Sequence, residues 1–91
     1  MNTTVKVVFR AYDDGEVVAV FPEILNNIGE NKGYSHKASW FFIEYRKLMR
    51  VTRTAKQKEY IDLFHEIRGK GFAGLMVYKR ARIKTKLIVQ Q

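Results

Sequence analysis

The chain has 91 residues, a formal net charge of +8 and no cysteine. Its length predicts one domain over residues 1–91, and the missing cysteines exclude disulfides, a thiolate nucleophile and a cysteine-based zinc site. No apolar run approaches the roughly 18 residues of a membrane-spanning helix, and the N-terminal residues do not resemble a secretory signal. We therefore expect a cytoplasmic protein that makes no contact with a membrane.

The first predicted element is a β-hairpin in VKVVFRAYDDGEVVAVFPE, residues 5–23. Two β-branched runs flank Asp14-Gly15, and this dipeptide readily adopts the positive φ angles of a two-residue type I′ loop. That loop defines the register of the two strands. The expected pairs are Ala11 with Val18, Arg10 with Ala19 and Phe9 with Val20. Asp13 then faces Glu16, a like-charge pair that indicates a bulge or a shifted turn.

This register divides the hairpin into two faces, because directly opposed residues share a face of the sheet. The predicted core face carries Val7, Phe9, Ala11, Val18 and Val20. The other face is mixed, and four of its side chains are too apolar for solvent, so they form a candidate interaction patch. The patch residues are Val8, Tyr12, Val17 and Phe21. Either a partner or second copy covers this patch, or the 23–33 loop or the C-terminal tail does.

The middle of the chain predicts a loop followed by a third strand. Pro22 should end the second strand near Phe21, and the Asn- and Gly-rich residues 23–33 are typical of a loop. Residues 35–42 predict a strand with a short helix after it. Its core-facing residues would be Ala38, Trp40 and Phe42. The alternative is a single helix that continues through residues 41–49.

The clearest helix is predicted over residues 55–68. Thr54 with Gln57 forms a capping-box pattern, and a following glycine, Gly69 or Gly71, should end the helix. An apolar stripe recurs at helical spacing and should pack on the sheet. Its residues are Tyr60, Ile61, Leu63, Phe64 and Ile67.

The last predicted strand covers residues 72–83, and residues 84–91 either extend it, add an edge strand or fray. The expected order is strand, strand, strand, helix, strand. Such an order predicts an α+β fold of two layers, in which one main helix packs on one face of a small antiparallel sheet.

Three stretches also carry a resemblance: VVFRAYDDGEVVAVFPE, TRTAKQKEYIDLFHEIRGKGF and VYKR. They resemble a group of small uncharacterised proteins encoded by gut Bacteroidales, often near phage-like or conjugative elements. The chain departs from that pattern at Thr54, at Lys56 and around Trp40. The resemblance supports the strand and helix predictions, and it implies no activity, cofactor or site residue.

Positive charge is concentrated in two blocks, which together are the candidate nucleic-acid-binding residues. Residues 35–58 carry a net charge of +6 and residues 72–91 a net charge of +5. Such clusters neutralise phosphates, although a solvated surface or a protected edge strand explains them as well. The first block consists of Arg46, Lys47, Arg50, Arg53, Lys56 and Lys58. The second consists of Arg80, Arg82, Lys84 and Lys86, with Lys79 beside them.

No arrangement in the sequence predicts catalysis, a metal site or a cofactor. The acidic residues at 13, 14 and 16 are explained by the turn, and neither His36 nor His65 has an acid at triad-like or metal spacing in the sequence. We expect a non-enzymatic binding protein that contacts DNA or RNA through a basic face. The alternative is a protein-interaction or homodimerisation module whose charge maintains solubility or meets an acidic partner.

Overall fold

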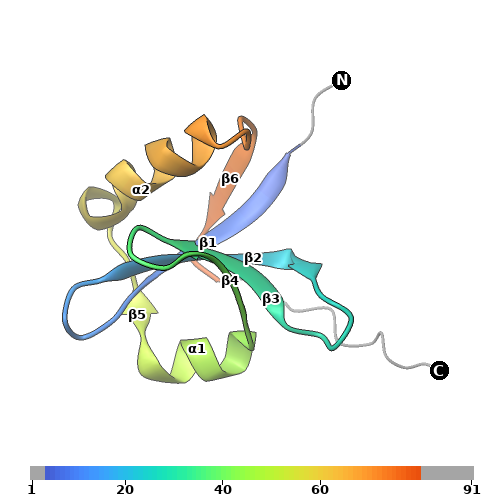
Figure 1. The fold of residues 1–91 in the computed structure, drawn as a ribbon. Helices are drawn as coiled ribbons and strands as arrows, with labels where there is room; N and C mark the ends of the chain where they lie inside the picture. The colour runs from blue at the N-terminus through green and yellow to red at the C-terminus, as the bar shows by residue number, and fades with distance from the viewer. Residues whose placement is uncertain (1–3, 81–91) are drawn as a thin grey trace.

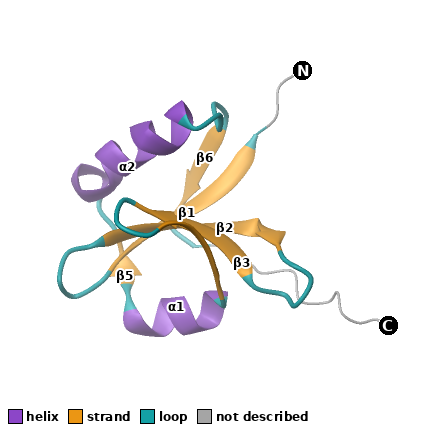
Figure 2. Cartoon of the chain, viewed as in Figure 1, coloured by secondary structure: helices purple, strands orange, loops and turns teal. Residues whose placement is uncertain are grey.

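The computed structural model describes residues 4–80, in which one six-stranded sheet has a helix on each face (Figures 1 and 2). The strands are β1 (Val5–Ala11), β2 (Val17–Leu25), β3 (Asn31–Ser35), β4 (Ser39–Ile43), β5 (Arg53–Thr54) and β6 (Leu75–Tyr78). The helices are α1 (Tyr45–Val51) and α2 (Gln57–Gly69). The predicted α+β class with one main helix, α2, is confirmed, but the prediction of two layers is wrong, because α1 covers the second face of the sheet. The second helix adds a third layer.

The sheet is mostly antiparallel and open. Its order is β4-β3-β2-β1-β5, and β6 also pairs with β1. Since β2 occupies one side of β1, both β5 and β6 lie along the other side, β5 beside Arg10 and Ala11 and β6 beside residues 5–8. The pairing of β6 with β1 is parallel, which the prediction of an antiparallel sheet missed.

The hairpin loop is one residue longer than predicted. The Tyr12 amide donates to the Glu16 carbonyl at 2.9 Å, and the Gly15 amide donates to the Tyr12 carbonyl at 2.9 Å. Gly15 has φ of 93°, and the Glu16 amide donates to the Asp14 side chain, so the loop is a three-residue turn with a glycine bulge. The strands therefore pair Ala11 with Val17, one residue away from the predicted register.

This shift of one residue moves the β2 side chains to the other face, because side chains alternate along a strand. Both faces of the sheet are consequently apolar, and each is covered by a helix. On the α2 face, the buried cluster contains Val7, Phe9, Ala11, Ala19, Phe21, Tyr34, Ala55, Leu63 and Ile67. On the α1 face, it contains Val8, Val18, Val20, Tyr45 and Leu48.

The predicted interaction patch is therefore wrong. Val8 and Phe21 are completely buried, and they lie in the clusters on opposite faces of the sheet. Tyr12 packs against the α1-face cluster and Val17 against the α2-face cluster, both half-buried. The patch depended on the two-residue loop and does not form with the longer one.

The segment predicted as a loop, residues 23–33, is a loop only at residues 26–30, and the residues on both sides belong to strands. β2 extends past Pro22 to Leu25, with a register shift between Phe21 and Leu25. The Asn31 side-chain amide donates to the carbonyls of Phe21 and Pro22, at 3.2 and 3.1 Å, where the regular ladder is interrupted. These bonds let β3 begin at Asn31 instead of after residue 33.

The predicted third strand is instead the second half of a hairpin. β3 and β4 are joined by a turn at residues 36–38, and Ser39 has φ of 61°. Ala38 is exposed, and Trp40 and Phe42 are 36 % and 46 % exposed, so the prediction that these three residues join the core is wrong. The short helix expected after this strand is α1.

Helix α2 agrees with its prediction, apart from a start two residues later. The Glu59 carboxylate accepts a hydrogen bond from the Lys56 amide at 2.8 Å, so the N-terminal cap is shifted from Thr54. Leu63 and Ile67 are buried against the sheet. Gly71, with φ of 109°, donates to the Arg68 carbonyl and ends the helix as expected.

Candidate functional site

Helix α1 presents three cations from the first basic block to solvent. Its apolar residues Tyr45 and Leu48 are buried in the α1-face cluster, which orients the helix. Arg46, Lys47 and Arg50 are exposed, and Arg46 and Arg50 are four residues apart, so they share a side of the helix. The pattern of buried and exposed positions thus gives this face of the molecule a cationic surface.

Arg10, in β1, links the end of α1 and β5 to the sheet. Its guanidinium group donates to the Thr52 carbonyl at 2.7 Å, to the Thr52 hydroxyl at 3.0 Å and to the Thr54 hydroxyl at 3.1 Å. It is 9 % exposed, and burial lowers the pKa of Arg10 from its ordinary value while Tyr45 acts in the opposite direction. Because each donor group of this cation meets an oxygen, Arg10 works as a structural clamp.

The remaining residues of the first block lie around β5 and the start of α2. Arg53 is opposite Ala11, on the α2 side, and forms two hydrogen bonds with the Glu59 carboxylate at 2.8 and 2.7 Å. Lys56 is exposed just before α2, and Lys58 is exposed in its first turn. The block is thus divided between the two faces, and the charge of Arg53 is matched by Glu59.

The start of the second block lies beside α1 and β5 at one pocket. Arg80 and Lys79, just after β6, line a pocket of about 550 Å³ together with Arg10, Tyr45, Met49 and Thr54. We call it the Arg10 pocket. Lys79 and Arg80 are exposed there, beside α1 and β5. The other residues of the second block, Arg82, Lys84 and Lys86, lie outside the described residues.

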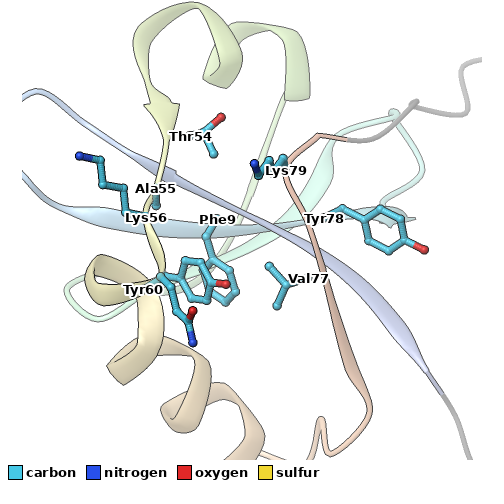
Figure 3. A pocket seen from close by; sticks show the side chains of 9 residues that line it. Phe9, Thr54, Ala55, Lys56, Tyr60, Val77, Tyr78 and Lys79 are labelled. Carbon is cyan, nitrogen blue, oxygen red and sulfur yellow. The ribbon is translucent and has the colours of Figure 1, made fainter.

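A second pocket, of about 750 Å³, opens on the α2 side of the same edge (Figure 3). Its lining includes Phe9, Thr54, Lys56, Tyr60, Val77 and Lys79, and we call it the β5–β6 cleft. Thr54 and Lys79 line both pockets, which places the two hollows next to each other. Within residues 4–80, no acidic side chain lines either one.

Carboxylates gather at a different part of the molecule. A third pocket, along α2 and the two neighbouring turns, is lined by Glu16, Glu59, Asp62 and Glu66, with His36 and Lys37 beside them. Glu66 accepts hydrogen bonds from the Tyr34 hydroxyl and from His36, which lower the pKa of Glu66. In the described part of the chain, no group of three or more His, Cys, Asp or Glu side chains is placed to hold a metal ion.

Two features of this surface escaped sequence reasoning. Arg10 looked like one polar position on a mixed strand, although two threonines flanking Arg53 offered the hydroxyl groups that it binds. The contact of His36 with Glu66 joins residues 30 positions apart, at 3.0 Å, and no local spacing predicts it.

Comparison with family models, with curated proteins and with solved structures finds no match for the chain. The resemblance to the Bacteroidales group stays a prediction. No helix within residues 4–80 is both long enough and apolar enough to span a bilayer.

Proposed function

We propose that the protein is a non-enzymatic binding protein that contacts DNA or RNA through the basic surface formed by α1, β5 and the residues after β6. The observation that supports this function is that Lys79 and Arg80 line the Arg10 pocket beside Tyr45 and Met49 of α1, the helix that carries Arg46 and Arg50. Two segments about 30 residues apart thus place Lys79 and Arg80 next to the helix of Arg46 and Arg50, and within residues 4–80 no carboxylate lines the pocket. A surface with clustered cations and separated anions attracts a polyphosphate backbone.

The test is a charge reversal on α1. We expect the double variant Arg46→Glu/Arg50→Glu to bind short DNA and RNA more weakly, with a salt dependence less steep by about two, since each lost phosphate contact removes roughly one released counterion. Fluorescence polarisation at several salt concentrations measures both quantities. Both side chains are exposed, so the thermal unfolding temperature should change little.

The matched control is Lys37→Glu/Lys70→Glu, which changes the net charge by the same amount. Lys70 follows α2, on the opposite face of the sheet from α1, and Lys37 lies in the turn between β3 and β4. This control should bind nearly as well as the unchanged protein. Equal weakening in both double variants would mean that only total charge matters, and a dissociation constant above about 10⁻⁴ M for every nucleic acid would end the proposal.

The alternative function, a homodimerisation module, is favoured by one observation at the other edge of the sheet. Among the described residues, β4 has no strand beside its outer edge, and its sequence Ser39–Ile43 contains no charge or proline. Unprotected edge strands pair with further strands, and an antiparallel pair of β4 strands would also cover Trp40 and Phe42.

Light scattering across a range of concentrations tests this alternative. A dimer that Phe42→Lys converts into a monomer would support it, because Phe42 lies in β4 and is 46 % exposed. A protein that stays monomeric at high concentration would exclude it.

A further inference from the structure

The edge of β1 is incompletely covered, because β5 and β6 are too short to meet. Along β1, the pairing with β6 ends at Val8, which is opposite Tyr78. The pairing with β5 starts at Arg10, which is opposite Thr54. Phe9 lies between these two pairs, and its carbonyl accepts a hydrogen bond from the Ala55 amide at 3.1 Å. The β5–β6 cleft is the space that remains above Phe9 on the α2 side (Figure 3).

The cleft has an aromatic side that packing keeps in place. The Tyr60 ring stacks on the Phe9 ring, with centroids 4.4 Å apart and planes within 6° of each other. Phe9 is buried in the core while Tyr60 is half-buried and lines the cleft. Figure 3 shows Tyr60 lying against Phe9, with Val77 reaching toward them from the β6 side. A planar ring that enters the cleft meets a rigid aromatic and aliphatic surface.

The polar groups of the cleft are cationic or neutral. Lys56 and Lys79 are exposed and come from opposite sides, before α2 and after β6. Gln57, also exposed, adds an amide that both donates and accepts hydrogen bonds. An aromatic surface between two lysines matches the chemistry of a base between two phosphates.

We propose that the β5–β6 cleft receives one base of a single-stranded nucleic acid, with Lys56 and Lys79 at the flanking phosphates. This inference rests on the nucleic-acid function proposed above and narrows it to single strands. A base in a duplex is paired and stacked on both sides, so it is not free to enter a cleft, whereas a base in a single strand is. The adjoining Arg10 pocket and α1 continue the cationic path for the backbone.

The test fills the cleft without changing its charge. Val77 lines the cleft and is 39 % exposed, so Val77→Phe should occupy the space while keeping a good strand residue. We expect the unchanged protein to bind a single-stranded DNA or RNA of about 12 nucleotides at least tenfold more tightly than the matching duplex. In Val77→Phe, the affinity for single strands should fall about tenfold and the affinity for the duplex should stay the same.

The matched control is Met76→Phe. Met76 is the preceding residue of β6, 42 % exposed, and its side chain lies on the other face of the strand, outside the cleft lining. Circular dichroism verifies that both variants fold, and the control should retain the preference for single strands.

The outcomes separate the two proposals. Equal, salt-dependent affinity of the unchanged protein for single strands and duplex would overturn the base-binding cleft and leave the nucleic-acid function standing. A preference for single strands that survives in Val77→Phe would place the base elsewhere and overturn the cleft as well. Absence of binding to both nucleic acids would overturn both proposals.

Discussion

Gly33 is the residue at which the sheet has least room. A Cβ atom at this position would lie 2.5 Å from Cε1 and 2.9 Å from Cζ of Phe41, and 3.1 Å from the Ala19 carbonyl oxygen. The Phe41 ring crosses over Gly33 from the neighbouring strand and packs against the α1-face cluster. We expect Gly33→Ala to lower the free energy of unfolding by about 1–3 kcal/mol, the usual cost of overpacking, as measured by urea denaturation.

Two further variants make this prediction specific. Gly69→Ala, in the last turn of α2, introduces the same methyl group where nothing lies within 4 Å, so it should raise stability by about 0.4–1 kcal/mol. In the double variant Gly33→Ala/Phe41→Leu, the smaller side chain should recover part of the loss. If Gly33→Ala behaves like Gly69→Ala, the close contact with Phe41 does not constrain the sheet.

Arg10 shows how one residue can be misread when its partners are distant. Within its strand it is a charged position between Phe9 and Ala11, which a sequence pattern assigns to solvent. Its partners are the oxygens of Thr52 and Thr54, more than 40 residues away, and they allow a cation to be buried with its donors satisfied. The long-range pairing of β5 with β1 is what brings these groups together, and nothing local in the sequence specifies it.

At the scale of elements, the Arg53–Glu59 pair joins β5 to the first turn of α2. Hydrogen bonds from Arg53 and from the Lys56 amide lower the pKa of Glu59 to about 2. A depressed carboxyl pKa stabilises the fold above the ordinary value of 4.5 and loses that effect as pH falls toward 2. We expect Glu59→Gln to melt a few degrees below the unchanged protein at pH 6, with the difference closing as pH approaches 2.

The control is Asp62→Asn on the same helix. Asp62 is exposed, and among the described residues its side chain accepts no hydrogen bond, so Asp62→Asn should leave the melting temperature at pH 6 nearly unchanged. Thermal melts monitored by circular dichroism measure all three proteins. A difference for Glu59→Gln that stays constant from pH 6 to pH 2 would show that the ionised carboxylate is not what joins β5 to α2.

The sequence positions of elements with strong local signals were predictable, but the pairing register of the strands was not. The apolar stripe of α2 recurs at helical spacing and ends at Gly71, so the helix was located from sequence alone. The hairpin was located too, but Asp14-Gly15 is compatible with loops of two and of three residues. The choice between them decides which face of the sheet each β2 side chain occupies. With the wrong loop, buried residues of the two faces were predicted to form an exposed interaction patch.

For the molecule as a whole, the two basic blocks were evident in the sequence, but their spatial relation was not. Lys79 and Arg80 reach the Arg10 pocket because β6 runs parallel to β1, a pairing that the prediction of an antiparallel sheet did not contain. Carboxylates from β-turns and α2 collect around the third pocket instead. The resulting separation of charge follows from tertiary structure, since each block taken alone is also compatible with an ordinary solvated surface.

The parallel ladder of β1 and β6 also has a consequence for how the chain acquires this shape. Val5 pairs with Leu75, so β1 has to wait for a strand that is about 70 residues further along the chain. The β1–β2–β3–β4 meander needs only neighbouring segments, and closing a long loop costs entropy before its contacts repay it. Assembly should therefore start in the meander and finish when β6 docks, which makes formation of the β5–β6 cleft the last event on the pathway.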